Sequence, residues 1–313
     1  MTNTYPLVSI VCLCYNHARF LPEALDSVLA QTYPNIEIIV VDDESTDESV
    51  SIIQSYLQHH PQLKFISTGQ NKGNCAAFNM GWRASQGAFI IDFSTDDVLL
   101  PDRVAQQVET FQKLNAATGV VYTDAEYITD NAEHISFHSQ KYKPAQSSAV
   151  FSEVIARYFI CPPTMMIRRE VFEKLGGYDE TLAYEDFDFW VRSARNFGYH
   201  YLDIVTTKRR VHEASLSQSW YAKGNRLLAS TVKVCEKIAA LLQTETEREA
   251  YRQRLKYEAR HAYFTANFSE AESFFGMLAE QGKVPFMYKM LRQLNSLKIN
   301  LTAVRKIYYQ VKH

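Results

Sequence analysis

Polar and acidic side chains directly follow three of the apolar runs in this chain. In chain order they are Tyr15 and Asn16, then Asp42 and Asp43, then Ser94, Thr95, Asp96 and Asp97. Paired carboxylates repel each other unless a cation lies between them. Carboxylate oxygens suit Mg²⁺ and Mn²⁺, which commonly bridge diphosphate oxygens. These residues therefore predict a site for a divalent metal and a phosphorylated ligand, with plain helix capping as the alternative.

The apolar runs that precede these side chains have the length of strands buried on both faces of a sheet. They cover residues 7–14, 36–41, 63–67 and 88–93. Segments with helical periodicity alternate with them, around residues 24–29, 75–85 and 102–114. This alternation predicts a Rossmann-like, mostly parallel sheet flanked by helices, and ligands bind such sheets at the carboxyl ends of the strands.

A further helix is expected directly after the Asp42–Asp43 pair. Ser45 and Glu48 have the spacing of a capping box, and Val50, Ile53 and Leu57 supply an apolar face behind it. The sequence thus predicts that this helix begins at Ser45.

The second half of the chain is less regular. Short strands are expected from about residue 120, helices near 152–158 and 169–175, and a largely helical region beyond 219. We expect one α/β domain over 1–217, with a nucleotide-binding half (1–100) and an acceptor half (101–217), followed by a helical region over 218–313.

Composition narrows the classes of partner. The chain has 33 basic and 35 acidic residues and a net charge of -2, so it lacks the positive field that nucleic-acid binding needs. Five scattered cysteines without a C-x-x-C pair favour a reducing cytoplasm over a disulfide or zinc framework. Neither a secretory signal nor an apolar run of membrane-spanning length is found.

Glycine-rich phosphate loops are missing from the ends of the expected strands. Neither G-x-G-x-x-G nor G-x-x-x-x-G-K-[ST] follows any of them. The sequence therefore disfavours a dinucleotide-dependent dehydrogenase and a P-loop NTPase.

Several motifs, in order and at the right spacing, closely resemble glycosyltransferase family two. They are Val8–Val11 with Tyr15–Asn16, Gln31–Asn35, Ile38–Asp43, Asn71–Gly73 with Asn79, Gly87–Pro101, Gly176–Glu180 and Glu185–Trp190. The resemblance covers about 215 residues. It implies an inverting enzyme of the GT-A fold that uses Mn²⁺ or Mg²⁺ and a nucleotide-sugar donor.

The resemblance also implies roles for individual residues. Tyr15 would lie against the nucleobase, Asp43 would hydrogen-bond it, and Asp96 would contact the ribose. Asn16 and Asn79 complete the nucleotide-binding set, and Asp97 would hold the metal. The chain departs from the family at Ser94, where an acidic residue is common, and at Phe78, where an arginine is common.

The acceptor hydroxyl needs a base on the face opposite the leaving group, and a metal-bound diphosphate needs no separate acid. By resemblance Asp186 is that base and Glu185 its acceptor-side or orienting partner. His212 resembles the histidine that often completes the metal or diphosphate site, with a structural histidine as the alternative. Arg210 beside it could contact a phosphate or lie at the surface. Tyr184 could stack on a sugar or pack in the core.

The expected reaction is transfer of a hexose or similar sugar from a UDP- or dTDP-linked donor. The acceptor would be a hydroxyl of a glycan, lipid-linked oligosaccharide or glycoprotein, as in polysaccharide biosynthesis. The alternatives are a sugar-nucleotide pyrophosphorylase, which would want a glycine- and lysine-rich loop near its N-terminus, and a catalytically silent nucleotide-sugar or glycan-binding module.

The segment 281–313 is locally basic, with seven Lys or Arg and no Asp or Glu. Leu291, Leu294, Leu297 and Leu301 form an apolar stripe beside these charges. This composition is typical of a helix that lies on a membrane surface, which would place the protein at the inner face of the membrane. The alternative is an amphipathic helix that packs on the protein or forms a homodimer.

Overall fold

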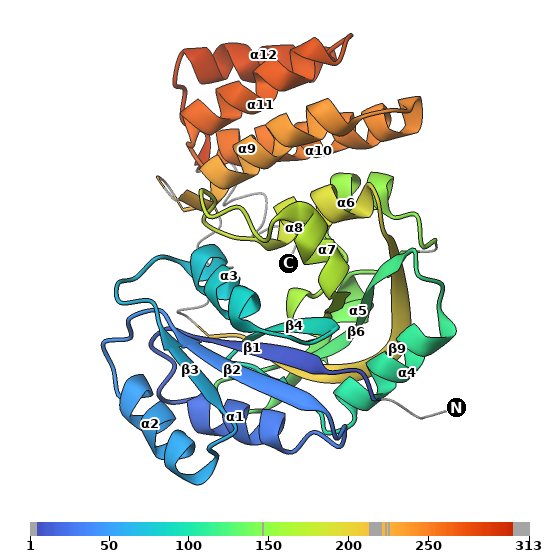
Figure 1. Ribbon diagram of the computed structural model, residues 1–313. Coiled ribbons are helices and arrows are strands. Elements are labelled where there is room, and N and C mark those ends of the chain that lie inside the picture. Colours follow the sequence, from blue (N-terminus) through green and yellow to red (C-terminus); the bar gives the residue numbers. More distant parts are fainter. Residues whose placement is uncertain (1–4, 146, 213–220, 223, 225, 303–313) are drawn as a thin grey trace. The chain divides into compact units, whose positions relative to one another are not determined.

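The computed structural model describes residues 5–145, 147–212, 221–222, 224 and 226–302 (Figure 1). Within them the strands form one sheet in the order β3-β2-β1-β4-β8-β6-β9-β5, and β7 pairs with β6. The strands are β1 (Val8–Cys14), β2 (Ile36–Asp42), β3 (Lys64–Ser67), β4 (Phe89–Ser94), β5 (Val98–Leu99), β6 (Thr118–Ile128), β7 (His134–Phe137), β8 (Met166–Arg168) and β9 (Gly198–Arg210).

Helices alternate with the first strands and dominate the end of the chain. They are α1 (Leu21–Leu29), α2 (Ser49–His59), α3 (Asn74–Ala84), α4 (Arg103–Lys113), α5 (His138–Lys141), α6 (Phe151–Ala156), the 3₁₀ turn η1 (Pro162–Thr164), α7 (Arg169–Leu175), α8 (Asp186–Ala194), α9 (Arg226–Leu241), α10 (Glu245–Phe264), α11 (Phe268–Glu280) and α12 (Phe286–Ser296). The strands and helices predicted for the first hundred residues are confirmed, with ends that shift by a few residues.

The first four strands of the sheet, β3, β2, β1 and β4, are mutually parallel, and every residue of β1 is buried. Residues of α1, α2 and α4 pack with Val8, Ile10 and Cys12 on one face of β1. On the other face a Cβ atom at Gly81 of α3 would lie 2.5 Å from Val11, so this helix approaches the sheet very closely. Helices thus cover both faces, as the continuous apolar runs predicted (Figure 1).

The second half adds antiparallel pairs to the sheet. β8 pairs antiparallel with β4 and β6, and β5 pairs antiparallel with β9. The longest ladder of this half, between β6 and β9, is parallel. The mostly parallel sheet flanked by helices is therefore confirmed.

The predicted start of α2 is wrong. The helix begins at Ser49, and its N-cap residue Glu48 makes no capping hydrogen bond through its side chain. Ser45 instead donates its hydroxyl to Asp42 at 2.5 Å and accepts the backbone N–H of Asn16 at 2.9 Å. The serine links two loops at the edge of the sheet, so its hydroxyl is engaged away from the helix.

The chain divides into two compact units. Unit 1 contains residues 1–150, 158–181 and 188–212, and unit 2 contains residues 151–157, 182–187 and 213–313. The domain boundary predicted near residue 217 lies outside the described residues. The helical character expected beyond 219 is confirmed by α9–α12. None of the described helices has both the length and the apolar character needed to cross a membrane.

Candidate active site

The carboxyl ends of β1, β2 and β4 meet at one edge of the sheet. Cys14 lies opposite Asp42, and Leu13 lies opposite Ser94. The next residues continue these ladders, because the Asp43 N–H donates to the Cys14 carbonyl oxygen at 2.9 Å and the Thr95 N–H to that of Leu13 at 3.0 Å. The structure therefore brings the predicted Tyr15, Asp43 and Asp96 segments to the same edge.

The loop after β1 presents an aromatic ring and pins the next loop. Tyr15 is 45% exposed. Asn16 has a positive φ of 58°, and its side-chain oxygen accepts the Thr46 N–H at 2.7 Å. Asn16 thus holds the β1–α1 and β2–α2 loops together, and the nucleotide contact expected for it stays a prediction.

Asp43 organises the loop that precedes α3. Its carboxylate accepts the Thr68 hydroxyl at 2.9 Å and the backbone N–H groups of Lys72 and Gly73, each at 2.8 Å. Asp43 is only 5% exposed. This buried carboxylate, with its three hydrogen bonds, fixes the loop before α3, and the hydrogen bond to a nucleobase stays a prediction.

Asp96 lies between two histidines. Its Oδ2 atom is 3.0 Å from His212 Nε2, while His17 Nδ1 lies 2.9 Å from the hydroxyl of the preceding Thr95. Burial alone would raise the pKa of Asp96, but hydrogen bonds from His212 and Ser94 and the charge of His17 lower it to about 2. The hydrogen bond to Asp96 in turn raises the pKa of His212. Asp96 is therefore an anion at neutral pH.

Asp97 is in the opposite electrostatic situation. Burial first, and then repulsion from Asp96, raise the pKa of Asp97 well above its usual value, and Arg209 and Arg210 oppose this shift. Its Oδ1 atom accepts the Arg210 backbone N–H at 2.8 Å. Two adjacent carboxyl groups thus differ sharply in how readily they ionise, which makes Asp97 sensitive to any added positive charge.

The chemistry of this turn fits a divalent cation. The buried Oδ1 atom of Asp96 has no hydrogen-bond partner among the described residues, and a cation beside Asp97 would favour its ionised form. Nowhere among the described residues do three or more His, Cys, Asp or Glu side chains form a group that could hold a metal by itself. Mg²⁺ usually takes one or two carboxylates together with substrate phosphates and water, so the Asp96–Asp97 turn suits a cation shared with a diphosphate.

Arg210 is a buried residue that is tied to several backbone oxygens. It is 3% exposed, and its guanidinium donates to the backbone oxygens of Asp96, Thr129 and Asp130. It also forms an ion pair with Glu23 at 2.6 Å. The surface alternative is therefore wrong, because Arg210 holds the end of β9 against the Asp96–Asp97 turn, and the phosphate contact stays a prediction. The sequence carried no signal for its partners, which lie far away along the chain.

Asn79 connects α3 to the loop that follows α7. Its side-chain oxygen accepts the Tyr178 N–H at 2.9 Å, and its amide group donates to the Tyr178 carbonyl and to Glu180, both at 2.9 Å. The residue is fully buried. These contacts give Asn79 a positioning role toward this loop, and the nucleotide contact expected for it stays a prediction.

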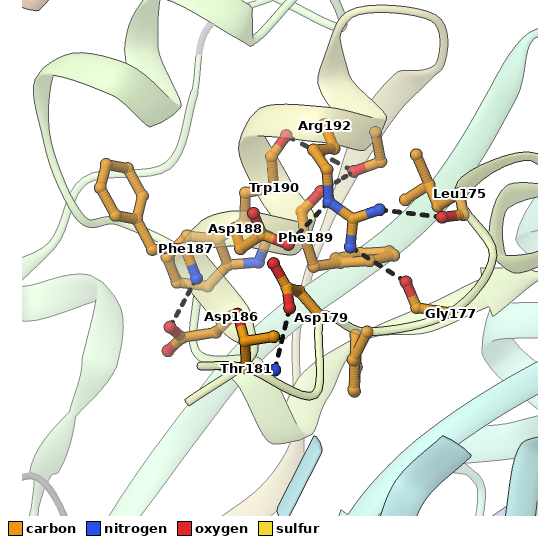
Figure 2. Close-up of polar contacts among 12 residues, drawn as sticks. Leu175, Gly177, Asp179, Thr181, Asp186, Phe187, Asp188, Phe189, Trp190 and Arg192 are labelled. Carbon is orange, nitrogen blue, oxygen red and sulfur yellow. Dashed lines mark hydrogen bonds and ion pairs between the residues drawn. The ribbon is translucent and has the colours of Figure 1, made fainter. Parts of the chain in front are cut away.

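The predicted base, Asp186, is the first residue of α8, and its Oδ1 atom accepts the N–H of Phe187 at 2.6 Å. Asp186 and Glu185 belong to unit 2, while Asp188, further along the same helix, belongs to unit 1. Figure 2 shows Arg192 of α8 bonded to Asp188 at 2.6 Å and to the carbonyl oxygens of Leu175 and Gly177. This network fixes α8 to the end of α7.

Tyr184 packs in the core of unit 2. It is 6% exposed, and its hydroxyl lies 2.8 Å from that of Thr231. The core alternative is therefore confirmed over stacking on a sugar. All five cysteines are buried, and none of them forms a disulfide.

Comparison with known proteins assigns this site to a family. The family model for glycosyl transferase family 2 matches residues 9–176. A glycosyltransferase of Rickettsia typhi is 34% identical over 223 residues, which cover 69% of this chain and 68% of the relative.

Two solved structures share the fold. S. aureus TarS 1–349 in complex with UDP-GlcNAc gives a TM-score of 0.69 at 18% identity, covering 97% of this chain and 91% of that chain. The mannosyltransferase PcManGT of Pyrobaculum calidifontis, in complex with GDP-Man and Mn²⁺, gives a TM-score of 0.63 at 17% identity, covering 98% and 88%. With the family match and the geometry of the strand edge, it follows that this chain belongs to glycosyltransferase family two and is a glycosyltransferase with the GT-A fold.

Proposed function

We propose that this glycosyltransferase is an inverting, metal-dependent enzyme that transfers a sugar from a UDP- or dTDP-linked donor. The acceptor is a hydroxyl of a glycan, lipid-linked oligosaccharide or glycoprotein, as in polysaccharide biosynthesis. The Asp96–Asp97 turn carries the proposal. It places the buried Oδ1 atom of Asp96, which has no hydrogen-bond partner among the described residues, beside Asp97, whose carboxyl a nearby cation would help to ionise.

The donor would lie along the edge formed by β1, β2 and β4. The exposed ring of Tyr15 offers a surface for the nucleobase, and the loop that Asp43 holds would border it. Asp96 would accept a hydrogen bond from the ribose. The ligands bound in the two structural neighbours, UDP-GlcNAc and GDP-Man, support a nucleotide-sugar donor but do not identify its base.

A bound divalent cation would stabilise the negative charge of the departing diphosphate. Asp97 would hold it. His212 is the second expected ligand, and its Nε2 atom would exchange the present hydrogen bond to Asp96 for the cation.

The transfer itself needs one base. The acceptor oxygen forms a bond to the anomeric carbon while the bond from that carbon to the diphosphate oxygen breaks, with its electron pair leaving on the diphosphate. Asp186 takes the proton of the acceptor hydroxyl, and Glu185 orients that hydroxyl. Attack from the face opposite the leaving group inverts the anomeric centre.

We further propose a cytoplasmic location at the inner face of the membrane, where a lipid-linked acceptor would be met. Buried cysteines that form no disulfide suit a reducing compartment. Exposed apolar side chains on α12, together with the exposed Lys289 on this helix and Lys283 before it, support contact with a membrane surface.

The test is nucleotide release from UDP-, dTDP- and GDP-sugars with Mn²⁺ and acceptor extracts, comparing the native chain with Asp97→Ala and Asp186→Asn. One donor should turn over. Asp97→Ala should lose turnover and metal-dependent nucleotide binding, whereas Asp186→Asn should lose about 10²- to 10⁴-fold in turnover and still bind nucleotide.

Two results would oppose the proposal. Turnover by Asp186→Asn at the native rate would remove the assigned base. Failure of every nucleotide to bind, with or without Mn²⁺, would favour a module that binds glycans without catalysis.

A further inference from the structure

Glu185 and Asp186 are called the acidic pair below. The segment that carries them packs with the C-terminal helices, although it lies more than thirty residues before these helices in the sequence. The backbone N–H of Ala183 donates to the hydroxyl of Ser230 at 2.9 Å. The hydroxyls of Tyr184 and Thr231 lie 2.8 Å apart. Ser230 and Thr231 are adjacent residues of α9, so one turn of this helix holds the chain directly before Glu185.

A second contact holds the residue directly after Asp186. The guanidinium of Arg254, on α10, lies 4.7 Å from the centre of the Phe187 ring. Its Nε atom donates to the carbonyl oxygen of Ile155 at 2.7 Å, and it pairs with Glu258 at 3.1 Å. A guanidinium over an aromatic ring is attracted to the face of the ring, and burial strengthens this attraction.

These contacts are buried, so water does not compete for them and they restrict the movement of the segment. Thr231 and Phe187 have no exposed surface, and Arg254 is 1% exposed. The Arg254–Glu258 pair could not be desolvated without further partners, and the Tyr221 hydroxyl donates to Glu258 at 3.1 Å. The backbone of the acidic pair is therefore held on both sides by α9 and α10.

We propose that Ser230, Thr231 and Arg254 are positioning residues for catalysis, which fix the segment bearing Asp186 so that its carboxylate meets the acceptor hydroxyl. The inference rests on the proposed role of Asp186 as base. It gives the C-terminal helices an indirect part in the chemical step, through the position of Asp186. A base displaced by about 1 Å loses about 10²-fold in rate, so small changes in these anchors matter.

The variants Ser230→Ala and Thr231→Val each remove one hydroxyl with little change in shape. The matched control is Tyr251→Phe, since the Tyr251 hydroxyl donates to the Cys235 carbonyl at 2.7 Å and links α10 to α9 away from the acidic pair. Each change removes one hydroxyl together with the hydrogen bonds it makes, so all three variants should lower the urea midpoint of unfolding by similar amounts. Arg254→Lys keeps a positive charge beside Glu258 but removes the planar guanidinium, so it tests the contacts of that group with Phe187 and Ile155.

The measurements are kcat, the KM for the donor found above, UDP and GDP affinity by calorimetry, and hydrogen exchange of a peptide covering 182–187. Ser230→Ala, Thr231→Val and Arg254→Lys should lower kcat tenfold or more, with donor KM and nucleotide affinity unchanged and faster exchange over 182–187. Tyr251→Phe should match the native kcat and exchange.

Three results would overturn the inference. The first is a kcat for the anchor variants equal to that of Tyr251→Phe. The second is faster exchange over 182–187 at an unchanged kcat, which would describe a purely structural contact. In both cases an inactive Asp186→Asn would leave the proposed function standing. The third, an active Asp186→Asn, would remove the base and the inference together.

Discussion

At the scale of single residues, the same carboxylate serves both the fold and the proposed donor site. Asp43 illustrates this, because its three hydrogen-bond partners include two backbone N–H groups of the loop before α3. The amide of an asparagine would turn an NH₂ group toward at least one of these donors. A donor facing a donor leaves a buried group unsatisfied.

Asp43→Asn should therefore lower the free energy of unfolding by about 1–3 kcal/mol and weaken nucleotide binding. Urea unfolding and calorimetry with UDP or GDP measure the two effects. Asp26→Asn is a suitable control. Among the contacts described, the Asp26 carboxylate accepts one hydrogen bond, from the Tyr56 hydroxyl at 2.7 Å, and this contact is exposed. A variant with native stability and native affinity would contradict the role assigned to Asp43.

The sequence placed most site residues by one argument, that side chains following parallel strands share an edge. The argument needs only local patterns, so it located Tyr15, Asp43 and Asp96. It missed His17 and the burial of Arg210, whose partners Thr129 and Asp130 are some 80 residues away. Such contacts depend on how β9 returns beside the Asp96–Asp97 turn, which no local pattern encodes.

At the scale of elements, the connection from α7 to α8 depends on two adjacent glycines. Gly176 and Gly177 both have positive φ, 75° and 91°. A Cβ atom at Gly176 would meet no atom within 4 Å, whereas one at Gly177 would collide with the side-chain oxygen of Asn79. The two positions share the backbone strain but differ in the contact.

Gly176→Ala should cost about 1–2 kcal/mol, the strain of a left-handed alanine. Gly177→Ala should cost more, by about another 1–3 kcal/mol, because Asn79 must release the Tyr178 N–H. Denaturant unfolding of both variants gives the difference. Equal losses would show that the Asn79 contact with this loop contributes little to stability.

Elements were predictable from sequence where periodicity and buried runs were long, as for β1, α3 and α4. The start of α2 was not, because the Ser45 hydroxyl bonds to Asp42 and Asn16 rather than to the helix. A capping motif identifies a side chain that is able to cap a helix. Whether it does so depends on the tertiary contacts that compete for the same side chain.

At the scale of the whole molecule, the composition of unit 2 could not be read from the sequence. Residues 151–157 and 182–187 join α9–α12 through packing between segments that are distant along the chain. The acidic pair thereby acquires neighbours that its own sequence context does not reveal. The exposed side chains of unit 2, more than its fold, bear on the proposed location of the enzyme at a membrane.

The exposed side of α12 and its flanks combines apolar and basic side chains. Phe286 is 81% exposed, Met290 46% and Leu297 65%, while Tyr288 and Leu291 of the same helix are buried. The stripe read from the sequence therefore divides, with Leu291 packed inward and Leu297 facing solvent. Lys283 and Lys289 are also exposed. An outward apolar face with lysines suits an anionic membrane surface.

Each lysine near such a surface contributes about 1 kcal/mol, so Lys283→Gln with Lys289→Gln should weaken binding to phosphatidylserine vesicles about thirtyfold. Phe286→Ser should weaken binding to these vesicles as well, and high salt should reduce only the lysine contribution. Vesicle co-sedimentation measures both, with Lys113→Gln on α4 as the charge control. Native binding by all variants would place the membrane contact elsewhere. Loss of a dimer in Phe286→Ser, without vesicle binding by the native chain, would instead identify this face as a contact between two copies.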